Sequence, residues 1–327
     1  MADAARDGQT ALALRLAKLL APLGDANDAT AIERNVAFSP LSVHAALALV
    51  AAGARGATQA ELLSFLGAPS ASQLAAFGRR VADSLLDDDR ADTGGPRVLF
   101  GGGVWVAQAV LRLPYRPNLP ADVWENKLVF KRKFPTMPLS FQGYASDRPL
   151  YLPANVQDTD INKAPDADAM QFSMFIFLPD ERDGFAAMVD TITAAPGHLY
   201  SILPRTTPDL VILKMPKFEI SFDWDLESDL RRLGLPLPFS PEAADLRGMF
   251  DKNDGRGTAF LTKVVHRAVV KVNEQGTEAG ASTAGMRGGG LPPRVVEFVA
   301  DHPFTFLIME ERSGVIVFAG HVLDPTK

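Results

Sequence analysis

The side chains that most often perform chemistry are few in this sequence and are not arranged for catalysis. The chain has no cysteine and five histidines, and it lacks a Gly-x-Ser-x-Gly elbow, a His-Glu-x-x-His pair and a Gly-x-x-x-x-Gly-Lys phosphate loop. The histidines, which show no spacing typical of a metal site, are His44, His198, His266, His302 and His321. We therefore expect no enzyme, no metal and no cofactor, and interpret each histidine as a hydrogen-bonded core or turn residue.

One segment near the C-terminus has an unusual composition, because residues 274–283 carry almost only small side chains. If this segment were extended, one face would hold Thr277, Ala279, Ala281 and Thr283, and the other Glu278, Gly280 and Ser282. Such small residues can enter a packed sheet without overpacking it, although glycine in a strand costs roughly 0.5–1 kcal/mol relative to alanine. The alternative interpretation is a flexible Ala/Gly/Ser linker.

Helices are predicted for the N-terminal part. Apolar spacing predicts a surface helix over 11–20, and Ser39 as N-cap with Pro40 in the first turn begins an apolar helix through Ala52 that belongs in a core. The pattern Thr58-x-x-Glu61 is a capping box for a helix over 59–66. A fourth helix is predicted over 71–86.

Strands dominate the rest of the chain. They are expected at 97–106, 127–131, 172–179, 210–222 with a bend at Pro216, 295–309 and 315–322, the last two joined by a hairpin turn at 310–314. Short helices are expected at 184–194 and 226–233. Early helices followed by strands predict an α+β protein with largely antiparallel pairing.

Composition excludes several classes of partner. The net charge is −6 and no Lys/Arg run is present, which argues against nucleic acid. No run approaches the roughly 20 apolar residues that cross a bilayer, so no membrane partner is expected. The first residues form a poor signal peptide and cysteine is absent, so we expect a cytoplasmic or nucleocytoplasmic monomer rather than an extracellular protein.

Seven short motifs occur in an order that resembles the serpin superfamily. They lie at residues 35–43, 53–58, 175–179, 215–220, 233–236, 244–249 and 299–304. The segments 276–279 and 320–325 look most like the plant branch. The resemblance is missing chiefly over 111–169, and Thr305 stands where the family usually has an apolar residue.

The resemblance implies a single domain, 1–327, with the α+β serpin fold: a multi-helix N-terminal half, three largely antiparallel sheets and a reactive-centre loop at 274–297. It also implies a suicide inhibitor of a serine or cysteine endopeptidase, in which the cleaved loop inserts into the main sheet. The residues that match the family's loop hinge are Glu274, Gln275, Gly276, Thr277, Glu278, Ala279, Gly280, Ala281, Ser282 and Thr283.

The bond that a protease would cleave has two candidates. Family spacing counted from Glu274 points to Gly290-Leu291, but glycine offers no side chain for a protease pocket to recognise. Chemistry favours Arg287-Gly288 for a trypsin-like enzyme, with a solvated loop arginine as the alternative interpretation.

The middle of the chain is short for a serpin. Trp105 and Trp124 are 19 positions apart, a shortfall of roughly 55 family residues for a chain of this class. The missing part would include an edge strand, a stretch of the main sheet and the helix that covers it. The alternatives to an inhibitor are therefore a non-inhibitory serpin, acting as a binding or interaction protein or as a plain protease substrate, and a nonfunctional truncated product.

Overall fold

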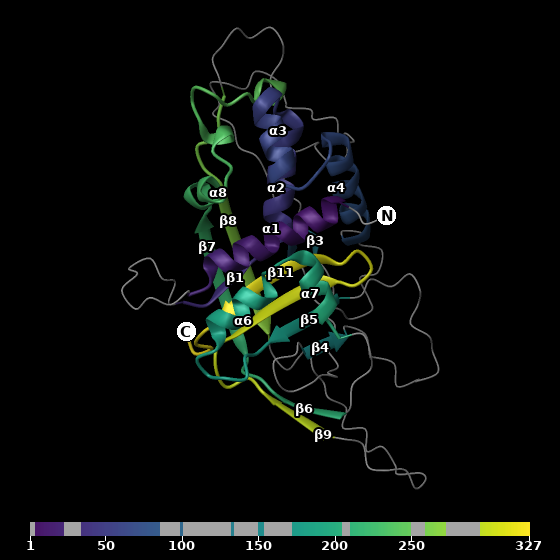
Figure 1. Cartoon of the computed structure of the whole chain (residues 1–327), viewed down its shortest axis with the longest axis vertical. Helices are drawn as coiled ribbons and strands as arrows, with labels where there is room; N and C mark the ends of the chain where they lie inside the picture. Colours follow the sequence, from purple (N-terminus) through teal and green to yellow (C-terminus); the bar gives the residue numbers. More distant parts are fainter. Residues whose placement is uncertain are drawn as a thin grey trace.

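The computed structural model describes residues 4–22, 34–85, 99–100, 132–133, 150–153, 172–204, 210–249, 259–272 and 295–327. Helices α2, α3 and α4 gather in one half, and the strands occupy the centre and the opposite end (Figure 1). The α+β class predicted from the sequence is confirmed in these residues.

The largest sheet is a five-stranded antiparallel one, and the C-terminal hairpin forms its centre. Its spatial order is β1-β11-β10-β5-β4. The bounds are Val36–Phe38 for β1, Leu150–Pro153 for β4, Phe172–Phe177 for β5, Phe304–Glu310 for β10 and Val315–Val322 for β11. The predicted hairpin turn is confirmed, and it contains Gly314 with a φ of 68°, a backbone conformation that favours glycine.

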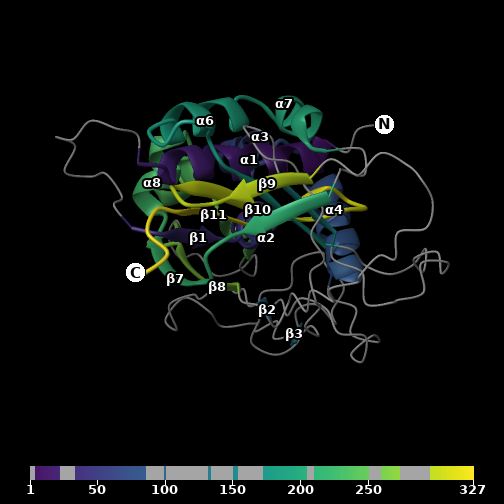
Figure 2. The same ribbon diagram turned by 90° about the horizontal axis from the view of Figure 1, so that it is seen from below.

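Helix α1, Ala4–Leu20, covers this sheet together with α6 and α7 (Figure 2). The helix predicted over 11–20 is confirmed, but it begins earlier, at Ala4, and is more buried than a surface helix, since Ala13 and Leu14 are buried as well as Leu12 and Leu16. Arg15 is half-buried, with its guanidinium 4.3 Å from the centre of the Phe65 ring.

Helices α2, α3 and α4 span Pro40–Gly53, Gly56–Phe65 and Ala71–Leu85, close to their predicted bounds. Ser39 caps α2 as predicted, its hydroxyl accepting the Ser42 N–H at 3.1 Å.

The predicted capping box of α3 was wrong. The helix begins after Arg55, and both box residues instead accept backbone N–H groups from a distant segment. Thr58 accepts from Asp245 at 2.9 Å, and Glu61 accepts from Leu237 at 2.9 Å. The two side chains therefore join α3 to the chain that follows α8.

The remaining helices are short. Two of them were predicted, α6 at Phe185–Ile192 and α8 at Glu227–Arg232. Helix α7, Pro196–Ile202, was not predicted, and neither were the single-turn 3₁₀ helices η1, Leu237–Phe239, and η2, Arg247–Met249.

The other described strands form three pairs. Strands β2, Leu99–Phe100, and β3, Arg132–Lys133, are antiparallel, as are β7, Phe218–Asp225, and β8, Val265–Val272. Strands β6, Leu210–Lys214, and β9, Val295–Val299, are parallel. The described strands thus fall into one five-stranded sheet and three two-stranded pairs.

Two predicted strand regions divide at prolines. The bend at Pro216 is confirmed, since β6 and β7 on either side of it belong to different sheets. The single strand predicted over 295–309 was wrong, because β9 and β10 are separate and Pro303, which has no N–H to donate, lies between them. The strand predicted at 127–131 lies outside the described residues, as does most of 97–106.

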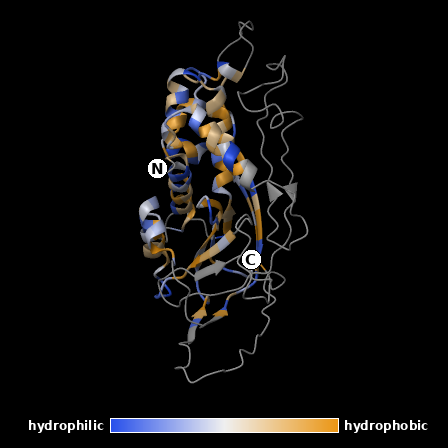
Figure 3. Cartoon of the chain, turned by 90° about the vertical axis from the view of Figure 1, so that its right-hand side faces the viewer, coloured by the Kyte–Doolittle hydropathy of each residue, from blue (hydrophilic) through white to orange (hydrophobic). Residues whose placement is uncertain are grey.

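One continuous apolar core joins the helical half to the strands, and orange residues run through both in Figure 3. It includes Leu12 of α1, Leu47 of α2, Phe222 of β7 and Phe306 of β10. Strands β7 and β8 lie on the side of the five-stranded sheet opposite α1, where β1 contacts both of them (Figure 2). This packing fixes the position of β8, which precedes the segment that the sequence singled out.

Candidate functional site

Residues 295–297 of the predicted loop belong to β9, and every loop residue before them lies outside the described residues. This applies to the hinge, 274–283, and to both candidate bonds, at Arg287-Gly288 and Gly290-Leu291. The structure does not describe the hinge or the candidate bonds, so their roles stay predictions. It does describe where the segment leaves and returns, at Val272 and Val295.

Strand β8, which leads into the loop, is held on one side by β7. The register runs from Val265 opposite Asp225 to Val272 opposite Phe218. Within the described part of the chain β7 is the only strand that pairs with β8, so the second edge of β8 has no described partner. The N–H and C=O groups of such an edge can pair with another extended segment.

The inner face of β8 is fixed by a buried histidine. Side chains of His266, Ala268 and Val270 point inward, and His266 Nε2 accepts the backbone N–H of Ser39 at 3.0 Å. Burial lowers the pKa of His266 to about 4, so the ring is neutral at pH 7 and can accept this bond. The contact ties β8 to the beginning of α2.

Sequence reasoning missed both β8 and the role of His266. The inward positions hold a histidine and an alanine, and the outward positions mix valine with charged residues. No apolar alternation is therefore visible. The usable signal was the paired charge at alternate positions, Arg267 and Lys271, which is typical of a strand with one solvent-facing side.

The outer face of the β7–β8 pair carries a row of cross-strand ion pairs. They are Lys263–Asp225 at 3.5 Å, Arg267–Asp223 at 3.3 Å and Lys271–Glu219 at 2.8 Å. Exposed pairs of this kind add little free energy each. Arg267 and Lys271 lie directly opposite Asp223 and Glu219, and opposite charges placed in this way favour this register over its neighbours, whereas Lys263 lies just before β8. Between them Val265 and Val269 remain 64% and 53% exposed.

The loop returns to the body of the protein through β9. Phe298 is buried, and the N–H of Ala300 donates to the Lys214 carbonyl at 2.8 Å just beyond the strand pair. In Figure 1, β6 and β9 lie at the end of the molecule opposite α2 and α3. Because β8 and β9 belong to different sheets, a cut in the segment between them would free its N-terminal part from β9 while both strands stay packed.

Two of the other histidines, His302 and His321, have the structural role that was expected, and His44 departs from it. His302 and His321 are hydrogen-bonded through both ring nitrogens. His44 is buried against the Phe77 ring and its Nε2 has no partner, contrary to the expectation of a fully bonded core histidine. Burial lowers the pKa of His44 to about 4.

Neither a metal site nor a membrane-spanning helix is found among the described residues. They contain no group of three or more His, Cys, Asp or Glu side chains that could hold a metal ion. No helix in the described part is long and apolar enough to cross a membrane.

Comparison with known proteins connects these strands to one family. A sequence model described as "Serpin (serine protease inhibitor)" matches residues 7–114 and 166–325. Serpin-Z2B of Oryza sativa subsp. japonica is 36% identical over 403 positions, covering 98% of this chain and 97% of the relative. Serpin-ZXA of the same plant is 34% identical over 394 positions, covering 97% and 96%.

The fold agrees with these relatives. The solved structure of Arabidopsis AtSerpin1 in its native stressed conformation superimposes with a TM-score of 0.75 at 25% identity, covering 100% of this chain and 99% of that one. The predicted resemblance to serpins is therefore confirmed. The chain belongs to the serpins, a family of protease inhibitors, and within it to the plant serpins.

Proposed function

We propose that this serpin inhibits a serine endopeptidase as a suicide substrate, with cleavage in the segment 273–294 followed by insertion of the freed part beside β8. The observation that carries the proposal is the second edge of β8, which has no partner among the described strands. The segment begins directly after β8, so its cleaved part needs only to fold back along that edge. An extended chain added to a sheet edge gains backbone hydrogen bonds along its length.

The composition of the hinge supports insertion. The positions that would face inward, Thr277, Ala279, Ala281 and Thr283, are small. The inner face of β8 is already filled by His266, Ala268 and Val270, and a neighbouring strand with small side chains can be accommodated there at native packing density.

The test is incubation of the purified chain with trypsin at near-equal amounts, followed by a denaturing gel and mass spectrometry of the C-terminal fragment. A covalent band heavier than the chain is expected, since insertion must trap the acyl-enzyme before water releases it. The fragment mass distinguishes cleavage after Arg287 from cleavage after Gly290. Cleavage without a covalent band would overturn inhibition of trypsin-like enzymes.

Two arginine substitutions separate insertion from simple cleavage. Ala279→Arg places a large charge on the face that must enter the sheet, so it should abolish the covalent band and leave cleavage intact. Glu278→Arg places the same side chain on the opposite face and should retain the band. Equal behaviour of the two variants would contradict insertion in this register.

A second candidate function is a non-inhibitory serpin that a protease cuts as a plain substrate. It is favoured by the interruption of the family match at residues 115–165 and by the glycines at 288–290. The alignment to Serpin-Z2B runs over 403 positions, more than the 327 residues of this chain, so the relative has positions with no counterpart here. Complete cleavage with no covalent product for any serine endopeptidase tried would favour this function.

A further inference from the structure

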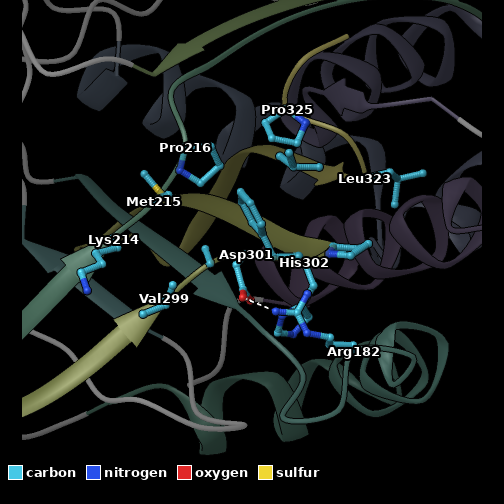
Figure 4. Close-up of a pocket in the computed structure, with 13 residues that line it drawn as sticks. Arg182, Lys214, Met215, Pro216, Val299, Asp301, His302, Leu323 and Pro325 are labelled. Atoms are coloured by element: carbon cyan, nitrogen blue, oxygen red, sulfur yellow. Dashed lines mark hydrogen bonds and ion pairs between the residues drawn. The ribbon is translucent and has the colours of Figure 1, made fainter.

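A cavity of about 640 Å³ lies at the C-terminal end of β9 (Figure 4). Three chain segments form most of its wall: residues 214–216, beginning with the last residue of β6; residues 299–304, from the last residue of β9 to the first of β10; and Val322, Leu323 and Pro325 near the C-terminal end. Arg182, between β5 and α6, contributes from a fourth. The volume is in the range typical of sites for small organic molecules.

Most of the wall is apolar. Met215, Pro216, Pro303 and Leu323 line it, and so does Val299, which is one of the few large apolar side chains of the described residues to be at least 36% exposed. A molecule bound against this concave apolar wall would remove the exposed side chain of Val299 from water. The wall therefore favours a ligand with an apolar body.

The polar groups of the wall include two cations, Arg182 and Lys214. His302 and a single carboxylate, that of Asp301, also line the cavity. Asp301 pairs with Arg182 and contacts the His302 ring. The partner of Lys214 is Glu297, which is not among the residues that line the cavity.

Some N–H donors of the cavity wall remain available to an acceptor on a bound ligand. His302 Nδ1 is 2.8 Å from the Asp301 carboxylate and its Nε2 is 2.7 Å from the Pro179 carbonyl. Both ring nitrogens thus have protein partners, so the further donors come from Arg182. Arg182 reaches Asp301 through one terminal nitrogen, and a guanidinium has five N–H donors in total.

We propose that this cavity binds a small amphipathic carboxylate, with its apolar body against Met215, Val299 and Leu323 and its carboxylate at Arg182 and Lys214. The site does not involve the reactive-centre loop, and the proposal stands apart from protease inhibition. Because Val299 and Lys214 belong to β9 and β6, a bound ligand would also hold that strand pair against the body of the protein.

The probe for the test is pyrene-1-butyrate, with pyrene-1-butanol as its uncharged match, each titrated by fluorescence into the full-length chain at low ionic strength. We expect saturable one-to-one binding of the acid, at least about fivefold tighter than that of the alcohol, with a difference that shrinks as salt is added. Absence of saturable binding, or equal affinity for acid and alcohol, would overturn the proposal.

Matched variants test the location. Arg182→Gln with Lys214→Gln should weaken binding of the acid about fivefold to tenfold and leave the alcohol within about twofold. Arg267→Gln with Lys271→Gln is the control, because these side chains are equally exposed, 70% and 60% against 70% and 62%, and also pair with acidic partners. An equal loss in the control would show a general charge effect and overturn the site.

A third variant tests the apolar wall. Leu323→Trp fills the cavity from a half-buried position near the chain end and should remove binding of both probes. Unchanged binding of both would place the ligand elsewhere and overturn the proposal.

Discussion

Thr305 stands in a buried strand position that serpins usually fill with an apolar residue, and His321 lies directly opposite it on β11. His321 Nε2 is 2.8 Å from the Ala17 carbonyl, which can only accept, so this nitrogen carries the hydrogen. Nδ1 is then an acceptor, and the Thr305 hydroxyl donates to it at 2.9 Å. Two polar residues without solvent exposure thus satisfy each other, and the histidine links α1 to the sheet.

We predict that Thr305→Val destabilises the fold although valine has the same shape. The substitution leaves His321 Nδ1 buried without a donor, which costs roughly 1–3 kcal/mol of unfolding free energy. Urea denaturation followed by circular dichroism measures the change. In a double-mutant cycle with His321→Leu, the two losses should not add; strict additivity would mean that the pair does not interact.

Three buried histidines predict that stability falls in mild acid. Burial lowers the pKa of each of His44, His266 and His321 to about 4 in the folded state, against 6.5 in the unfolded chain. The unfolded state binds protons first as the pH falls, so stability is fully present above pH 6.5 and is lost progressively toward pH 4. The loss should be on the order of 1–3 kcal/mol per histidine.

Denaturation at pH 7.5, 6.5, 5.5 and 4.5 checks this dependence. His266→Gln keeps an acceptor for the Ser39 N–H but does not titrate, so its stability should fall less steeply over the same range. A stability that is constant or rises toward pH 4.5 would show that these rings are already charged in the folded state.

At the scale of elements, the close approach of β1 and β11 depends on a glycine. A Cβ added to Gly320 would lie 2.3 Å from the Val36 carbonyl oxygen and 2.7 Å from the ring of Phe306. Backbone and a packed aromatic cannot both give way, so Gly320→Ala should lower the thermal midpoint markedly through overpacking, by an amount equivalent to roughly 1–3 kcal/mol or more.

Gly197→Ala is the matched control for that substitution. Gly197 lies in α7 and an added Cβ meets nothing within 4 Å, so alanine should raise the midpoint slightly through roughly 0.5–1 kcal/mol of better helix propensity. Scanning calorimetry of both variants tests the pair. A neutral Gly320→Ala would mean that β1 and β11 are less tightly packed than described.

Elements whose signals are local were predictable from the sequence, and elements fixed by distant partners were not. Helix α2 begins at Ser39 and the final hairpin turns at Gly314, because the cap and the turn residue lie next to what they control. Thr58 and Glu61 matched a local rule, yet they bond to segments 187 and 176 residues away. Strand β8 was missed because its inward face contains His266, whose partner Ser39 is 227 positions earlier.

The same distinction between local signals and distant partners applies to the candidate site. The loop at 274–297 was predicted from motifs on either side of it, and the family match covers those motifs, while the loop itself stays a prediction. The role of His266 in anchoring β8 required the fold, since nothing near it in the sequence pairs with it. The cavity at Arg182 and Lys214 is assembled from four segments, and no spacing along the chain could have predicted it.

At the scale of the whole molecule, the N-terminal and C-terminal segments of the chain are joined by hydrogen bonds. The Gln9 side chain donates to and accepts from the backbone of Ile316, and the Asn35 side chain accepts the N–H groups of Leu323 and Asp324. Strands β10 and β11 lie inside the main sheet, flanked by β1 and β5. A cut in the loop would therefore leave the C-terminal fragment packed in the core, where only denaturant should release it.

This arrangement decides what cleavage should do to stability. If the freed segment adds to the second edge of β8, the cut chain gains backbone hydrogen bonds and buried area that the intact chain lacks, while the fragment that holds β10 and β11 stays in place. We predict that trypsin-cleaved protein unfolds at a higher temperature than the intact chain, by roughly 2–4 °C for each kcal/mol gained. Calorimetry before and after cleavage measures the shift, and the Ala279→Arg variant should lose it while Glu278→Arg keeps it. A midpoint that falls or stays the same in the unaltered chain would mean that the segment does not insert, and the chain would then be a cleavable substrate rather than an inhibitor.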